Sequence, residues 1–177
     1  MTSIDRDHRL IAILRGITAR ETGDVVAALI ETGYRAIEVP MNSPDALASI
    51  EIAVDTTRQL TPDACLIGAG TVLAVEEVAR VKALSANLIV SPNTDPSVIK
   101  ATRDAGMQSL PGVFTPTEAH LAPKADVKSG DVLVCWKKDV NKQRLGRISG
   151  SLFMPTKISR KHGVSNSRTV CTRSSAG

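Results

Sequence analysis

Residues 36–42 read Ala-Ile-Glu-Val-Pro-Met-Asn, a short apolar run that contains one acidic residue and ends in polar residues. Three other runs have the same form: Leu10-Ile-Ala-Ile-Leu-Arg-Gly16, Cys65-Leu-Ile-Gly-Ala-Gly-Thr71 and Leu88-Ile-Val-Ser-Pro-Asn93. Each run is followed by a segment with helical periodicity. Short apolar runs that alternate with helices are typical of βαβ units around a parallel sheet. Parallel strands are covered on both faces, which explains why these runs are almost continuously apolar.

Capping residues predict where the helices begin and end. Thr18, with Glu21 three residues later, has the pattern of a capping box, and Gly33 is placed to end the first helix. Later helices are predicted to begin at Ser43-Pro44, at Asp95-Pro96 and at Thr115-Pro116, because proline is favoured in the first turn.

The regular alternation continues to about residue 122 and then fails. A fifth strand is predicted over residues 108–114. Pro123 is expected to interrupt the helix after it. Residues 131–136 could form one more strand, and residues 142–177 have too few apolar residues to offset the entropy of ordering. We therefore expect a barrel portion over residues 1–122 and a divergent segment over residues 123–177, largely disordered from about residue 142.

The charge of the chain changes sign at the same place. Residues 1–122 contain 10 Lys and Arg against 15 Asp and Glu, a net charge of −5, and residues 123–177 contain 12 against 3, a net charge of +9. The sum is the +4 of the whole chain. Such a basic run is usually a solvated surface. Few aromatic residues are available for base stacking, so a nucleic-acid partner is not expected.

Composition excludes several other classes of protein. No stretch is long and apolar enough to span a membrane, and the beginning of the chain lacks a signal-peptide pattern, so we expect no membrane partner and a cytoplasmic location. The three cysteines indicate neither a disulfide framework nor a zinc site. Cys65 is expected to be a buried core residue, and His8, His120 and His162 to be surface residues. No metal and no cofactor are expected.

Polar side chains at the carboxyl ends of the strands are the candidates for function. In a (β/α) barrel these ends converge on the face where chemistry is done, so we expect Arg15, Glu38 and Thr71 to share a pocket. A carboxylate in such an interior is desolvated, which raises its pKa towards neutrality and suits Glu38 to general acid–base catalysis. The alternative is a purely structural Glu38 paired with Arg15.

Arg15 and Thr71 are candidates for substrate binding. The guanidinium of Arg15 could bind a carboxylate or a phosphate, or could serve only to neutralise Glu38. Thr71 follows Gly68-Ala-Gly70, where the backbone could approach a ligand closely, and its hydroxyl could reach a carboxylate or carbonyl.

These runs, together with Pro111-Gly112, resemble the bacterial 2-keto-3-deoxy-6-phosphogluconate and 2-keto-3-deoxy-6-phosphogalactonate aldolases. The resemblance covers residues 9–122, and Pro40-Met-Asn-Ser-Pro44 is more similar to the phosphogalactonate branch. It implies an α/β fold, a (β/α)8 TIM-type barrel, usually in a homotrimer. At 177 residues the barrel is expected to be incomplete, with about five to six βα units and an irregular basic tail.

The resemblance also implies a class I (Schiff-base) mechanism that needs no metal. A lysine condenses with the keto group of the substrate, and cleavage gives pyruvate and glyceraldehyde 3-phosphate. By position, the resemblance makes Glu38 the catalytic acid and base, and it assigns Arg15 and Thr71 to the pyruvate end of the substrate.

One element of the family pattern is missing. The resemblance places the Schiff-base lysine in a Leu-Lys-Leu-Phe-Pro motif, and counting forward from Pro111-Gly112 lands on Asp131. Lys124, Lys128 and Lys137 are nearby, but none has these neighbours. We expect a truncated aldolase with an out-of-frame or otherwise replaced C-terminus that cleaves little or no substrate. The alternative is a non-catalytic barrel fragment that binds small keto-acid anions or a partner subunit.

Overall fold

The computed structural model describes residues 10–61, 65–124, 132–133 and 156–157. Five strands pair in parallel in the order of the sequence: β1 (Ala12–Ile13), β2 (Ala36–Pro40), β3 (Leu66–Gly70), β4 (Leu88–Ser91) and β5 (Gln108–Pro111). Each strand is followed by one helix: α1 (Ala19–Glu31), α2 (Ala46–Leu60), α3 (Val75–Ala83), α4 (Pro96–Asp104) and α5 (Pro116–Lys124). The predicted alternation is confirmed.

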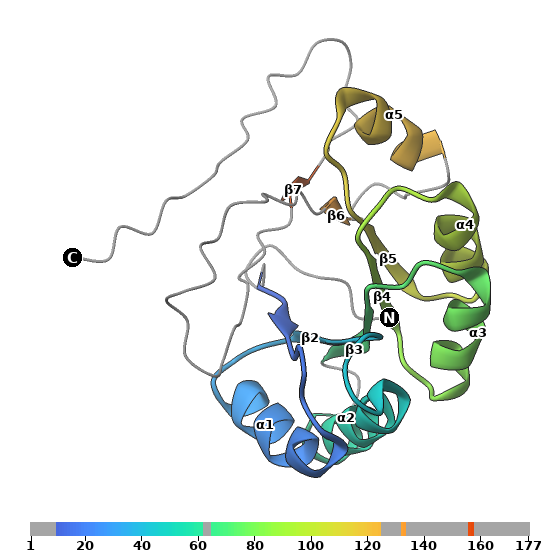
Figure 1. Cartoon of the computed structure of the whole chain (residues 1–177). Helices are drawn as coiled ribbons and strands as arrows, with labels where there is room; N and C mark the ends of the chain where they lie inside the picture. Colours follow the sequence, from blue (N-terminus) through green and yellow to red (C-terminus); the bar gives the residue numbers. More distant parts are fainter. Residues whose placement is uncertain (1–9, 62–64, 125–131, 134–155, 158–177) are drawn as a thin grey trace.

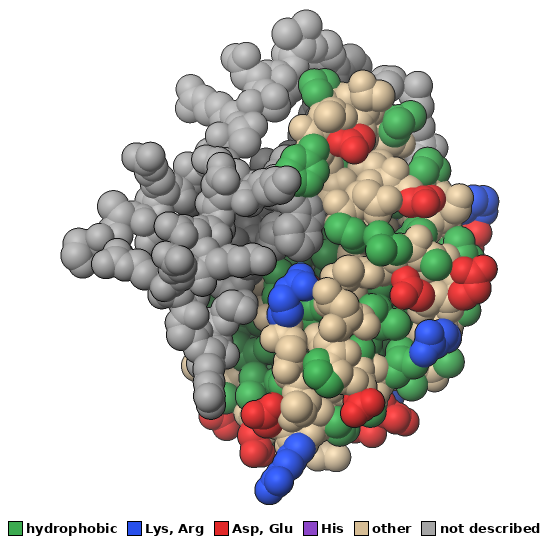
Figure 2. Space-filling view, viewed as in Figure 1, with side chains coloured by type: hydrophobic (Ala, Val, Ile, Leu, Met, Phe, Trp, Pro, Cys, Tyr) green, Lys and Arg blue, Asp and Glu red, His purple; other side chains and the backbone are tan. Residues whose placement is uncertain are grey.

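The helices form an arc outside the strands, as in part of a TIM-type barrel (Figure 1). Alternate strand residues therefore face two different surroundings. On β2, Ile37 and Val39 join the core between the sheet and the helices, whereas Ala36 belongs to a second apolar cluster on the inner face of the sheet. Glu38 lies between Ile37 and Val39, so the alternation places its side chain on the inner face. Charged side chains are scattered over the outer surface of the helices (Figure 2).

Several predicted helix caps are confirmed. The Glu21 carboxylate accepts hydrogen bonds from the Thr18 hydroxyl at 2.6 Å and from the Thr18 N–H at 3.3 Å, and the first of these is the main reason that the pKa of Glu21 is lowered. Asp95 caps α4 by accepting from the N–H groups of Ser97 and Val98. α1 ends before Gly33, whose φ of 96° lies in the left-handed region that favours glycine.

The predicted start of the second helix is wrong. α2 begins at Ala46, after Asp45, and Pro44 lies in the preceding turn. Asp45 is the N-cap residue of α2. The Ser43 hydroxyl instead accepts the Gly16 N–H, which ties this turn to the one after β1.

Other boundaries also differ from the prediction. β1 is shorter than residues 10–16, since its ladder with β2 pairs only Ala12 and Ile13 before the chain turns at Gly16. β5 ends at Pro111 rather than Phe114, and α5 continues through Pro123 by one residue. Within the expected strand 131–136 the structure describes Val132–Leu133 (β6), which is extended and pairs antiparallel with β7 (Thr156–Lys157). The expected disorder from residue 142 concerns residues outside the described ones, apart from β7.

In the part of the chain that the structure describes, no helix has both the length and the apolar character needed to cross a membrane.

Gly23→Ala is expected to stabilise the protein. Gly23 lies within α1, and an added Cβ would be 3.7 Å from Thr56 Oγ1 and 3.8 Å from Ile52 Cγ2, which are ordinary contacts. A glycine inside a helix costs roughly 0.5–1 kcal/mol relative to alanine. Urea unfolding of both chains should show this increase in the free energy of unfolding, and a decrease would show that the contacts with α2 are overpacked.

Candidate active site

Glu38 is a buried acid on the inner face of the barrel wall. It is the third residue of β2, and its side chain is only 3% exposed. The space for its carboxylate exists because Gly70 on β3 has no side chain, since a Cβ on Gly70 would overlap all three carboxylate atoms of Glu38. Two features of the sequence thus place this carboxylate: the alternation of side chains along β2, and the glycine that faces Glu38 on β3.

Burial raises the pKa of Glu38 to about 8. The positive charge of Arg15 and a backbone hydrogen bond from Gly70 act in the opposite direction but do not cancel the effect of burial. Among the described residues, none forms a hydrogen bond with the carboxyl oxygen Oε2. Glu38 is therefore mostly protonated at pH 7 and can both give and take a proton near neutrality, which suits general acid–base work.

Arg15 lies at the exit of β1, exposed to solvent. Its Nη1 donates to Asn42 Oδ1 at 3.3 Å, and the neighbouring Gly16 N–H donates to Ser43 Oγ at 3.0 Å. Arg15 influences Glu38 through its charge. In the described part of the chain, no group forms a hydrogen bond with Glu38 Oε2. In the structure the charge of Arg15 thus acts on Glu38, but the two side chains do not form the ion pair that the structural alternative requires.

Thr71 directly follows Gly70, at the exit of β3. Its φ of 58° is unusual for a β-branched residue, and such a conformation costs of order 1–3 kcal/mol unless the surroundings impose it. The backbone around it is held by a hydrogen bond from the Met41 N–H to the Gly70 carbonyl at 2.8 Å. Thr71 is half-buried and sits one residue from the contact between Gly70 and Glu38.

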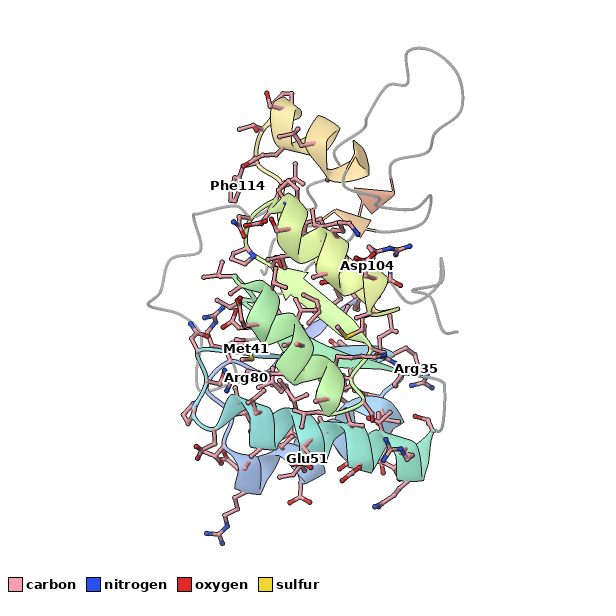
Figure 3. The ribbon with its side chains drawn as sticks, turned by 90° about the vertical axis from the view of Figure 1, so that its right-hand side faces the viewer. Arg35, Met41, Glu51, Arg80, Asp104 and Phe114 are labelled. Atoms are coloured by element: carbon pink, nitrogen blue, oxygen red, sulfur yellow. The ribbon has the colours of Figure 1, made fainter. Side chains whose placement is uncertain are left out.

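The predicted residues therefore lie at one edge of the sheet. Figure 3 shows Met41, after β2, and Phe114, after β5, on one side of the molecule, and Arg35, before β2, and Asp104, at the end of α4, on the other. Arg15 and Thr71 follow β1 and β3 at the edge marked by Met41.

Three contributors to this edge were missed by sequence reasoning: Asn42, Ser43 and Gly70. Asn42 and Ser43 look like ordinary turn residues, and nothing local signals that they bind Arg15 and Gly16, from which each is 27 residues apart. Gly70 was read as a place for close ligand approach, whereas its missing side chain accommodates Glu38.

The described residues also contain a cavity of about 170 Å³ at the opposite end of β3. It is lined by the last turns of α2, by Cys65 and Ile67 at the start of β3, and by Ser85 and Asn87. Cys65 is 4% exposed, as expected for a core residue. No group of three or more His, Cys, Asp or Glu among the described residues is placed to hold a metal ion. The side chains of His8, His120 and His162 lie outside the described ones.

Comparison with known proteins decides the family. The family model described as KDPG and KHG aldolase matches residues 1–129, well over half of the chain. The chain belongs to this family. It is 53% identical over 119 residues to the probable 2-dehydro-3-deoxy-6-phosphogalactonate aldolase of Rhizobium meliloti (strain 1021), covering 67% of this chain and 54% of that protein. It is 43% identical over 120 residues to the 2-dehydro-3-deoxy-6-phosphogalactonate aldolase of Escherichia coli (strain K12), covering 68% and 57%.

A solved structure, described as a native KDPGal structure, has the same fold. Its TM-score is 0.68 at 39% identity, over 76% of this chain and 62% of that one. The predicted resemblance and the partial TIM-type barrel are thereby confirmed. The chain spans about half the length of the curated relatives that it matches.

Proposed function

We propose that this chain carries the keto-acid half of a class I aldolase site that acts on 2-keto-3-deoxy-6-phosphogalactonate or -gluconate. The proposal is based on Glu38, which is buried and has a pKa raised to about 8. The charge of Arg15, at the carboxyl ends of the strands, acts on it. The phosphogalactonate aldolases among the similar proteins support the same substrate class.

In this proposal each residue has a separate task. Arg15 and Thr71 bind the carboxylate of the pyruvate moiety, since a guanidinium and a hydroxyl both donate to anionic oxygen. Glu38 gives a proton to the departing hydroxyl when a lysine amine condenses with the keto carbon and water leaves. As a carboxylate it then takes the proton of the hydroxyl on the aldehyde carbon while the carbon–carbon bond breaks, and it returns that proton to the enamine carbon.

A Schiff-base site also requires a lysine amine. The chain contains no Leu-Lys-Leu-Phe-Pro motif, and the side chains of Lys124, Lys128 and Lys137 lie outside the described ones. This observation favours the second candidate function, a barrel fragment that binds small keto acids without cleaving a carbon–carbon bond. We expect this chain to bind pyruvate and to show little or no cleavage.

Calorimetric titration with pyruvate, followed by borohydride reduction and mass spectrometry, tests both candidates. We expect binding that Arg15→Gln weakens by about tenfold or more, because a charged hydrogen bond to a carboxylate is lost. We expect no stoichiometric adduct. An adduct on one lysine would establish the aldolase reading and identify the nucleophile. A chain that does not bind pyruvate at all would contradict both candidates.

A further inference from the structure

We propose that Asn42 is a positioning residue that holds the Arg15 guanidinium where its charge acts on Glu38. The catalytic role of Asn42 rests on the proposed function, whereas its effect on Arg15 and Glu38 can be measured without pyruvate. Asn42 and Arg15 lie at the exits of neighbouring parallel strands and are joined by the 3.3 Å hydrogen bond from Arg15 Nη1 to Asn42 Oδ1.

The chemistry of the two groups fixes the orientation of this contact. A guanidinium has donors and no acceptor, so only the amide oxygen of Asn42 can face it. The amide therefore has one favourable orientation here, with the oxygen towards Arg15 and the NH2 group turned away. A residue that offers only donors at position 42 could not make this hydrogen bond.

A second hydrogen bond limits the movement of the same two turns. Gly16, next to Arg15, donates its N–H to the hydroxyl of Ser43, next to Asn42, at 3.0 Å. Two consecutive residues of one turn are thus bonded to two consecutive residues of the other. Gly16 has a φ of 77°, so the chain turns immediately after Arg15. The hydrogen bond from the Gly16 N–H to Ser43 holds the turn in position. The hydrogen bond with Asn42 then determines where the guanidinium of Arg15 lies.

The strand residues next to Glu38 are uncharged. Glu38 is paired with Ile13 on β1 and with Gly68 on β3, and its carboxylate lies against Gly70. Among the residues that the structure describes, Arg15 supplies the charge that lowers the pKa of Glu38 against the effect of burial. If the guanidinium is released into solvent, its stabilisation of the Glu38 carboxylate weakens. Asn42 thus influences the protonation of Glu38 through Arg15, without touching it.

The test is a double-mutant cycle read by the titration of Glu38 itself. The carboxyl carbon of Glu38 is followed by 13C NMR in the full chain, assigned by its loss in Glu38→Gln, for the unaltered protein, Asn42→Leu, Arg15→Gln and the double variant. Each single variant is expected to raise the pKa of Glu38, by about half a pH unit because the charge of Arg15 is exposed to solvent. The double variant is expected to match Arg15→Gln, because Asn42 has nothing left to position.

Two outcomes would overturn the inference: an unchanged titration in Asn42→Leu, or a further rise when Asn42→Leu is added to Arg15→Gln. Asn42 is exposed, so its replacement should leave the fold intact, and the dispersion of the NMR spectrum verifies this. Pyruvate is absent from the experiment. Failure of the unaltered chain to bind pyruvate would therefore count against the proposed function and leave the positioning role of Asn42 decided by the titration.

Discussion

Glu38→Gln is expected to remove a steep pH dependence from the stability of the protein. In the folded chain the pKa of Glu38 is raised to about 8, against 4.5 for an ordinary glutamate. Between these values the unfolded chain releases a proton that the folded chain retains. The free energy of unfolding therefore falls by about 1.4 kcal/mol per pH unit as the pH rises. This contribution is fully present below pH 4.5 and is lost as the pH rises through the folded pKa.

The measurement is urea unfolding at pH 5, 6 and 7. Relative to Glu38→Gln, the unaltered chain should lose about 2–3 kcal/mol of unfolding free energy between the two ends of this range. Glu51→Gln is a matched control, because it makes the same chemical change at an exposed position on the outer face of α2 (Figure 3). Parallel pH curves for the unaltered chain and Glu38→Gln would show that Glu38 is ionised in the folded protein and would remove the main support for its role as an acid.

The order of the strands and helices was predictable because its signals are local. The Thr18 and Asp95 caps and Gly33 act on the backbone within a few residues, so the sequence around them is sufficient. The position of Glu38 on the inner face also follows from a local rule, the alternation of side chains along a strand. Its raised pKa is then a consequence of burial that the neighbours Ile37 and Val39 already indicate.

The details at the strand exits were not predictable, because they depend on contacts between distant residues. Ser43 is a residue type that is common at helix starts. Its hydroxyl accepts a hydrogen bond from the Gly16 N–H, and the helix begins three residues later at Ala46. Direct pairing of Arg15 with the opposite charge of Glu38 was the structural alternative that the sequence left open. The structure gives the hydrogen bond to the neutral Asn42, which remains accessible to solvent, while Glu38 is buried and mostly protonated.

Gly68→Ala is expected to prevent folding and Gly70→Ala to permit it, although the two glycines are separated by one residue of β3. At Gly68 an added Cβ would collide with the backbone carbonyl group of Leu88, which is paired with Gly68 in the sheet. A backbone atom in a strand cannot move aside alone, so the two strands must separate. We expect a loss of more than about 4 kcal/mol, the range in which small domains fail to fold, seen as a loss of cooperative unfolding in urea.

At Gly70 the added Cβ would instead meet the carboxyl group of Glu38, the far end of a flexible side chain. The carboxyl group can rotate away at a cost typical of overpacking, about 1–3 kcal/mol, so we expect Gly70→Ala to fold. It should nevertheless bind pyruvate about tenfold more weakly, because the displaced Glu38 carboxyl group moves into the space beside Arg15 and Thr71 that the proposed site needs for pyruvate. Gly23→Ala, with no close contact, is the control for the substitution itself. If Gly70→Ala binds pyruvate as tightly as Gly23→Ala does, the position of the Glu38 carboxylate against β3 does not matter for binding. If Gly68→Ala unfolds as cooperatively as Gly23→Ala, the close approach of β3 and β4 is not a constraint on the fold.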